Sequence, residues 1–205
     1  MSRPADGPRA GGEATWRCFV AVSLADPARS AVVEYLAGLR PAVPGVGWAR
    51  PEQLHLTLKF LGNVAPARIP ALGARLADAV GGIPACTAEV AGVGAFPNLA
   101  RPQVLWVGVR APSLAALADA VEASCAAEGF ERETRPFRPH VTLGRVRERG
   151  RRAPPELALL GRDGDRAFGT SPLREVTLFR SVLGSGGARH DVLGSFPLAT
   201  VAGFP

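Results

Sequence analysis

The sequence has few of the residues that cross-link a chain or carry it into a membrane. Its three cysteines, Cys18, Cys86 and Cys125, are odd in number and widely spaced in apolar segments, which argues against a disulfide framework and a zinc site. No apolar run is long enough to cross a bilayer, and residues 1–15 hold no hydrophobic stretch that would serve as a signal peptide. We therefore expect a cytoplasmic protein that is not bound to a membrane, with its thiols free and buried.

Lysine and histidine are also scarce. Lys59 is the only lysine among 24 basic residues, and the chain contains three histidines. The net charge of +6 favours an anionic partner such as a nucleic acid, although so strong an arginine bias also arises from coding composition. The charge therefore leaves nucleic-acid binding open without establishing it.

The order of the predicted elements indicates an α+β fold. Residues 1–15 are polar and rich in Gly and Pro, so we predict a disordered tail followed by a single bilobal domain over residues 16–205. Hydrophobic periodicity predicts the order β-α-β-α-β-β-α-β-loop-β-β, with the long loop over residues 147–172. The first helix should end at Pro41, because proline cannot continue it.

Two of the three histidines lie in near-identical tetrads, HLTL at residues 55–58 and HVTL at residues 140–143. Alternate side chains of a strand project from the same face, so each tetrad should present a histidine and a threonine on one surface and bury its apolar residues. The polar members are His55, Thr57, His140 and Thr142. One tetrad is typical of any half-buried strand, but two in a chain with three histidines indicate a shared task.

Paired imidazoles suit acid–base chemistry. Imidazole gives or takes a proton near neutral pH, so two facing histidines can act as acid and base in one reaction. A metal site is the rival interpretation, but neither tetrad adds a carboxylate, a cysteine or a second histidine at ligand spacing. An acid–base pair without an obvious nucleophile favours displacement at phosphorus, for which the strained ring of a 2′,3′-cyclic phosphate is a fitting substrate. The threonine hydroxyls would then bind the non-bridging oxygens.

Strand parity makes two predictions about the residues that follow the first tetrad. Lys59 should share the face of His55, where it would contact the substrate or form a solvated cation at the strand end. Phe60 should join the core, although an aromatic ring near the site would also suit stacking on a terminal base.

Arg145 follows the second tetrad and has the opposite parity to His140. It reaches the site only if the backbone bends or bulges near Gly144, a residue type that permits such distortion. A cation there would assist phosphate binding.

These residues resemble the RNA 2′,3′-cyclic phosphodiesterases, also called the 2′-5′ RNA ligase-like family, of the two-histidine phosphoesterase superfamily. The resemblance covers nearly the whole chain after the tail, and the paired His-x-Thr-x motifs are its most specific part. The similar blocks are RCFVAVSL, PEQLHLTLKFLGNV, GVGAFPNLARPQVLWVGV, RPFRPHVTLGRV and LFRSVLGSGGARHDVLGSFPL.

The resemblance implies a bilobal α+β fold in which two antiparallel sheets face each other across a central cleft, with helices on the outside. It implies opening of an RNA-terminal 2′,3′-cyclic phosphate to a 2′-phosphomonoester without metal or cofactor, and in some members 2′-5′ ligation. His55 would be the proton donor to the departing 3′ oxygen, and His140 the proton acceptor that activates water. Thr57, Thr142 and Arg145 would hold the phosphate.

His190 lies outside both motifs, after the turn GSGGAR, where the family often has an aromatic residue. We interpret it as structural or peripheral. Two alternative functions stay open: a module that binds RNA ends without turnover, and a phosphodiesterase that acts on a small cyclic phosphate metabolite. We expect a monomer whose partner is RNA with a 2′,3′-cyclic phosphate end.

Overall fold

The computed structural model describes residues 14–147, 155–184 and 187–201. In these ranges the strands are β1 (Trp16–Ser23), β2 (Val46–Trp48), β3 (His55–Val64), β4 (Cys86–Phe96), β5 (Val104–Arg110), β6 (His140–Val146), β7 (Ala167–Leu173), β8 (Glu175–Gly184) and β9 (Gly187–Pro197). The helices are α1 (Ala28–Ala42), α2 (Ile69–Val80) and α3 (Leu114–Ala127), with 3₁₀ helices η1 (Pro51–Gln53), η2 (Pro66–Arg68) and η3 (Pro155–Asp163). Most of the predicted tail, residues 1–13, lies outside the described residues.

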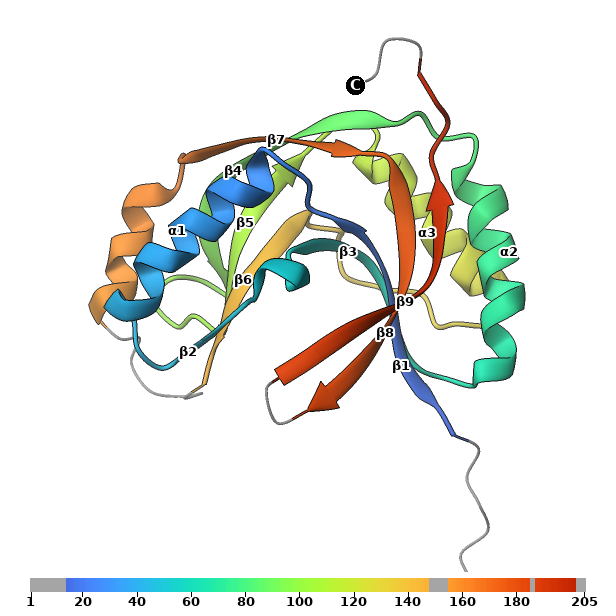
Figure 1. Cartoon of the computed structure of the whole chain (residues 1–205), viewed down its shortest axis with the longest axis horizontal. Coiled ribbons are helices and arrows are strands. Elements are labelled where there is room, and N and C mark those ends of the chain that lie inside the picture. The colour runs from blue at the N-terminus through green and yellow to red at the C-terminus, as the bar shows by residue number, and fades with distance from the viewer. Residues whose placement is uncertain (1–13, 148–154, 185–186, 202–205) are drawn as a thin grey trace, which may run out of the picture.

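The strands form one curled antiparallel sheet in the order β7-β4-β5-β6-β3-β1-β8-β9, with β2 paired to β6. The strands arch over a concave face, as Figure 1 shows. One half of the sheet holds β7, β4, β5 and β6, and the other holds β3, β1, β8 and β9. The halves are joined where Leu56 of β3 pairs with Val141 of β6. The predicted α+β class is therefore confirmed, and its two sheets are the two halves of this curled one.

The helices pack on the outside of the two halves. α1 contacts β7 and β2, whereas α2 contacts β9 and α3 contacts β3. Figure 1 accordingly shows α1 on one flank and the adjacent pair α2 and α3 on the other. Helices thus cover the convex side of each half, and the concave side carries the predicted site.

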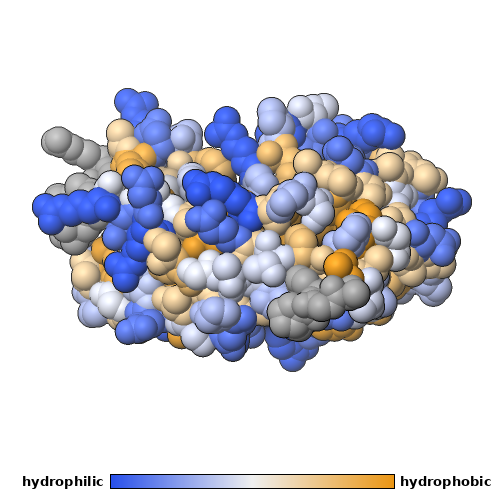
Figure 2. Space-filling model, turned by 90° about the horizontal axis from the view of Figure 1, so that it is seen from above, coloured by the Kyte–Doolittle hydropathy of each residue, from blue (hydrophilic) through white to orange (hydrophobic). Residues whose placement is uncertain are grey.

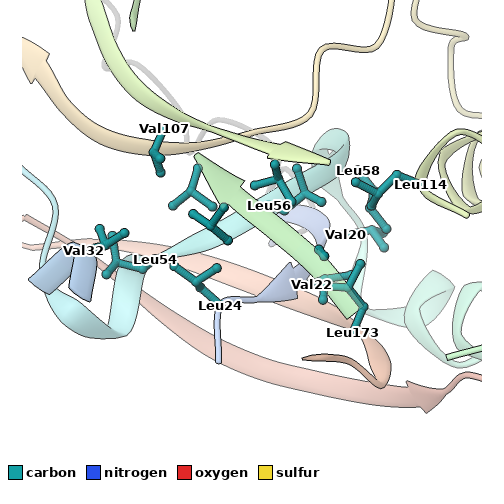
Figure 3. Packing of buried hydrophobic residues seen from close by; sticks show 14 of the residues in the cluster. Val20, Val22, Leu24, Val32, Leu54, Leu56, Leu58, Val107, Leu114 and Leu173 are labelled. Carbon is teal, nitrogen blue, oxygen red and sulfur yellow. The ribbon is translucent and has the colours of Figure 1, made fainter. Parts of the chain in front are cut away.

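The core lies between the sheet and these helices. Side chains of β1 and β3 such as Val20, Val22 and Leu56 point into it together with Leu114 of α3 (Figure 3). Each fully buried side chain of this kind contributes about 1.5–3 kcal/mol to folding. A smaller apolar cluster of Phe19, Ala21 and Phe179 is separate from this core. Because Phe19 and Ala21 alternate with Val20 and Val22 along β1, this strand is buried on both faces, and the smaller cluster lies on the concave one.

Three local predictions were wrong. Helix α1 runs through Pro41 to Ala42, because a proline in the last turn removes a single backbone donor while Val43 N–H still bonds to Leu39 O. The predicted loop over residues 147–172 contains β7, which pairs with β4; residues 148–154 of that loop lie outside the described residues. Strand β2 was also missed, since its three residues lie in a Pro- and Gly-rich connection.

The outer surface is chemically mixed. On the face seen in Figure 2, hydrophilic and hydrophobic residues alternate rather than gather into one apolar area. None of the helices in the described ranges combines the length and the apolar character needed to span a membrane.

A substitution at Gly144 should test how tightly β2 packs on β6. A Cβ at Gly144 would lie 2.8 Å from Val46 Cγ1 and 3.0 Å from Trp48 Cε3. We expect Gly144→Ala to lower the free energy of unfolding by about 1–3 kcal/mol, because these groups must shift. Urea unfolding measures the loss. In the control, Gly38→Ala in α1, the new Cβ meets nothing within 4 Å, and a gain of about 0.5–1 kcal/mol is expected; equal effects at both sites would contradict this account.

Candidate active site

The pairing of β3 with β6 brings the two tetrads side by side. Leu56 and Val141 are opposite each other in antiparallel strands and are both buried. Antiparallel geometry then sets His55 beside Thr142 and Thr57 beside His140. These four polar side chains lie on the face of the sheet opposite to Leu56 and Val141. Two motifs far apart in the sequence thus present their polar side chains on one concave surface.

Each motif histidine bonds to the backbone two residues before it. Nδ1 of His140 lies 2.6 Å from the carbonyl oxygen of Arg138. The ring of His55 forms a corresponding hydrogen bond with the backbone of Gln53. Because the Arg138 carbonyl accepts the proton of Nδ1, neutral His140 keeps its lone pair on Nε2. This nitrogen is therefore the one available to take a proton.

Aromatic side chains support both imidazoles. The ring of His55 stacks on Phe19 with a centroid separation of 4.9 Å and lies 6.1 Å from Phe179. The ring of the second motif's histidine is edge-on to Phe96 at 5.0 Å and lies 6.5 Å from Trp106. Each half of the sheet therefore holds its own histidine by two aromatic rings and one backbone hydrogen bond.

His190 lies beside His55, a contact that its interpretation as structural or peripheral did not anticipate. Its ring lies 5.2 Å from the His55 ring and 4.9 Å from Phe19, with centroids as the reference points. β9 reaches this place because it pairs with β8, which itself pairs with β1. No spacing in the sequence relates His190 to His55, since the contact depends on the sheet order.

A bulge follows the first motif. Thr57 pairs with Ala21 and Lys59 pairs with Val20, so Leu58 has no partner on β1. An extra residue of this kind reverses the facing of every side chain after it. The parity predicted for the residues after Leu58 was therefore wrong.

Lys59 consequently points to the helix side. It is 5% exposed, and its ammonium lies 2.8 Å from Glu122 Oε1 and 2.5 Å from the carbonyl oxygen of Glu131. Its cation is committed to this ion pair, which fastens α3 to β3. Phe60 turns the other way and is 61% exposed rather than in the core.

A second bulge occupies the same place in the second motif. Trp106 of β5 pairs with Thr142, and Leu105 pairs with Gly144. Leu143 is therefore the extra residue on β6. The condition set for Arg145, a bulge near Gly144, is met, and Arg145 lines the same cavity as Thr142. Each motif thus presents three side chains on the same face. They are the histidine, the threonine two positions after it, and the residue five positions after the histidine, which is Phe60 in one motif and Arg145 in the other.

A cavity of about 1000 Å³ extends from the motifs along the connection between α3 and β6. Its lining includes Thr57, Phe60, His140, Thr142 and Arg145, and at the α3 side also Lys59 with its partner Glu122. The ring of the first motif's histidine is not among the lining residues and sits at the side, packed on its aromatic support.

Burial disfavours the charged form of both motif histidines. Burial, together with the nearby charge of His190, lowers the pKa of His55 to about 4. Burial also lowers the pKa of His140, as does the charge of Arg145, while the hydrogen bond with Arg138 opposes the shift. Among the residues that the structure describes, no group of three or more His, Cys, Asp and Glu side chains is placed to hold a metal ion.

Two His-x-Thr motifs on adjoining strands of a curled antiparallel sheet, each histidine oriented by the backbone, define the class of two-histidine phosphoesterases. A family model for the 2′-5′ RNA ligase superfamily matches residues 26–180. The chain belongs to this family.

Similar proteins share most of their length with this chain. An RNA 2′,3′-cyclic phosphodiesterase of Archaeoglobus fulgidus is 35% identical over 169 residues, covering 82% of this chain and 92% of the relative. One of the same name from Thermus thermophilus is 34% identical over 194 residues, covering 89% and 90%. Among solved structures, TT0787 of Thermus thermophilus has a TM-score of 0.72 at 32% identity and covers 90% of this chain and 98% of its own. Escherichia coli LigT complexed with 3′-AMP has a TM-score of 0.71 at 27% identity, covering 90% and 99%.

The Lys59–Glu122 ion pair predicts a stability effect without a direct catalytic one. Lys59→Met leaves Glu122 partly buried without its cation, which should lower the free energy of unfolding by about 1–3 kcal/mol. Denaturant unfolding measures this, and Arg135→Ala is the control, because Arg135 pairs with Glu133 while 82% exposed and should change stability by less than about 1 kcal/mol. Lost turnover at unchanged stability would instead show that Lys59 acts on the substrate.

Proposed function

We propose that the chain is a metal-independent RNA 2′,3′-cyclic phosphodiesterase that opens the cyclic phosphate to a 2′-phosphomonoester. The observation that carries this proposal is the register of β3 on β6, which sets two His-x-Thr pairs on one concave face. The names of the relatives support the same activity. His140 is the proton acceptor, His55 the proton donor, and Thr57, Thr142 and Arg145 bind the phosphate.

The reaction needs two proton transfers. Nε2 of His140 takes a proton from water as the water oxygen bonds to phosphorus. The bond from phosphorus to the 3′ oxygen breaks, and His55 gives its proton to that oxygen. The 2′ ester bond stays intact, so the product is a 2′-phosphate. Because the two imidazoles carry both protons, the proposed step requires no metal ion.

The charge of the substrate sets the state of His55. A proton donor must hold a proton, whereas burial lowers the pKa of His55 to about 4 in the empty site. A phosphodiester anion beside the ring favours the protonated form, because an opposite charge within a few ångströms raises the pKa of an imidazole. The Arg145 guanidinium and the threonine hydroxyls would meanwhile stabilise the negative charge that gathers on the non-bridging oxygens.

An RNA end fits this cavity better than a small cyclic metabolite. Its volume of about 1000 Å³ exceeds what a cyclic phosphate alone would fill. Phe60 offers an exposed aromatic face in the same cavity, and such faces stack on unpaired bases with little sequence preference. The net charge of +6 favours a polyanion.

Three further features belong to the proposal. A terminal RNA 5′-hydroxyl in place of water would convert the same step into 2′-5′ ligation. The protein acts as a monomer, because one chain supplies both motifs and the residues after their bulges. It acts in the cytoplasm, a reducing compartment that matches the free thiols of Cys18, Cys86 and Cys125.

Removing either motif histidine should abolish most of the turnover. We expect His55→Ala and His140→Ala each to lower kcat on a short RNA with a 2′,3′-cyclic phosphate end by about 10²–10⁴-fold, since each removes one proton transfer. The assay contains excess chelator, and chromatography against synthetic 2′- and 3′-phosphate standards identifies the product.

Thr57→Val and Thr142→Val should also slow the reaction, whereas Thr87→Val, on the exposed side of β4, serves as the matched control. Full turnover by both histidine variants would refute the mechanism. Tight, salt-dependent binding of the RNA end without any product would favour the binding-module alternative.

Phe60 should matter only when the substrate has a terminal base. Stacking on one base contributes about 1–3 kcal/mol, so Phe60→Ala should lower kcat/KM on an adenine-terminated RNA by about five- to a hundredfold. On the same RNA with an abasic terminal ribose cyclic phosphate, the variant should match the unmodified protein. Leu183→Ala, at a residue 75% exposed, is the control for loss of an exposed apolar side chain. Equal losses on both RNAs would exclude base stacking.

A further inference from the structure

The ring of His190 packs against three other rings, which together form an aromatic box. Its centroid lies 4.9 Å from Phe19, 5.2 Å from His55 and 6.2 Å from Phe179. The planes of His190 and His55 cross at 70°, so the edge of one imidazole meets the face of the other. The position therefore couples His190 directly to the proposed proton donor.

Packing alone does not explain an imidazole in this box. Nδ1 of His190 is buried and has no hydrogen-bond partner among the described residues. Leaving a buried polar atom unpaired costs about 1–3 kcal/mol, and a phenyl ring would fill the same space without that cost. The ring nitrogens of His190 thus serve something other than the stability of the box.

Charged groups surround His190 on several sides. Arg50 and Glu52 act on it from the segment around η1, with opposite effects on its charge. On β9 itself, Asp191 acts on it and is paired with Arg189. His55 of β3 is a further titratable neighbour, in ring contact with His190. The effects of the acidic and basic groups on the pKa of His190 have opposite signs and cancel in part. The remaining interaction is the repulsion between the two imidazoles when both are charged.

We propose that His190 is a positioning residue for the phosphodiesterase proposed above: it holds the His55 ring edge-on and competes with that ring for a single proton. His55 consequently stays neutral in the empty site and becomes protonated when a phosphodiester anion enters. The proposal rests on the proposed function for its role in catalysis, but the competition itself is a property of the free protein.

The order of protonation follows from burial and separation. Burial lowers the pKa of both rings, and the charge of His190 lowers the pKa of His55 further. Two cationic imidazoles 5.2 Å apart repel each other, so the pair readily accepts one proton and resists a second. His190 takes the first proton because its ring is less buried.

Histidine NMR tests this competition directly. The chain has three histidines, so the Cε1–H resonances are assigned from the His55→Ala, His140→Ala and His190→Phe spectra. In His190→Phe and in His190→Gln the midpoint of the His55 titration should rise by about half a pH unit to two pH units, the range that Coulomb's law gives between exposed and partly buried surroundings. His140 is the internal control, and its midpoint should not move.

The pH profile of kcat is the second readout, because kcat reports the groups of the enzyme–substrate complex. His55 must be protonated to act, and the bound phosphodiester anion raises its pKa, so kcat falls as the pH rises through the pKa of His55 in the complex. Removal of His190 should move this alkaline limb to higher pH. Two variants are needed because Phe preserves the ring and Gln preserves a polar side chain, while neither carries a charge. A His55 midpoint that stays or falls in both folded variants would overturn the proposal, whatever happens to the rate. If the His55 midpoint rises but the protein hydrolyses no cyclic phosphate, the proposed function is refuted while the competition between His190 and His55 for a proton is confirmed.

Discussion

The pairing of Leu56 with Val141 is the contact on which the site depends. It joins two halves of a sheet whose other strands pair within their own half. Side chains alternate with a period of two along a strand, so a slip of one residue here would turn a histidine and a threonine into the core and two apolar residues out. Burial of Leu56 and Val141 against the helices fixes the register and, with it, the approach of the two motifs.

Each half prepares its histidine independently of the other. A backbone hydrogen bond from two residues upstream fixes the ring, and two aromatic side chains flank it. The same packing removes water from the imidazoles and lowers the pKa of both. A phosphate anion would supply the charge that this environment lacks, so its binding would favour protonation of His55, the proposed donor.

The sequence indicated the motifs well and the chain beyond them less well. Alternation of buried and polar residues through each tetrad predicted the shared faces of His55 and His140, because regular strands obey a period of two. Leu58 gave no sign of its bulge, so Lys59 and Phe60 were assigned to the wrong faces, whereas Gly144 did signal the second bulge. The place of His190 depends on which strands become neighbours across the whole sheet, and local patterns carry no information about that order. β7 was missed for a related reason, since its pairing with β4 is what makes it a strand.

The residues that follow the two bulges differ in chemistry, so the two motifs are not equivalent in the cavity. One motif ends in the aromatic Phe60 and the other in the cationic Arg145, while the histidines and threonines before them are the same. A nucleotide has a flat face at one end and a negative charge at the other. In the proposed function the base would lie on Phe60 and the phosphate between the two motifs beside Arg145, so a nucleotide would bind in one direction only.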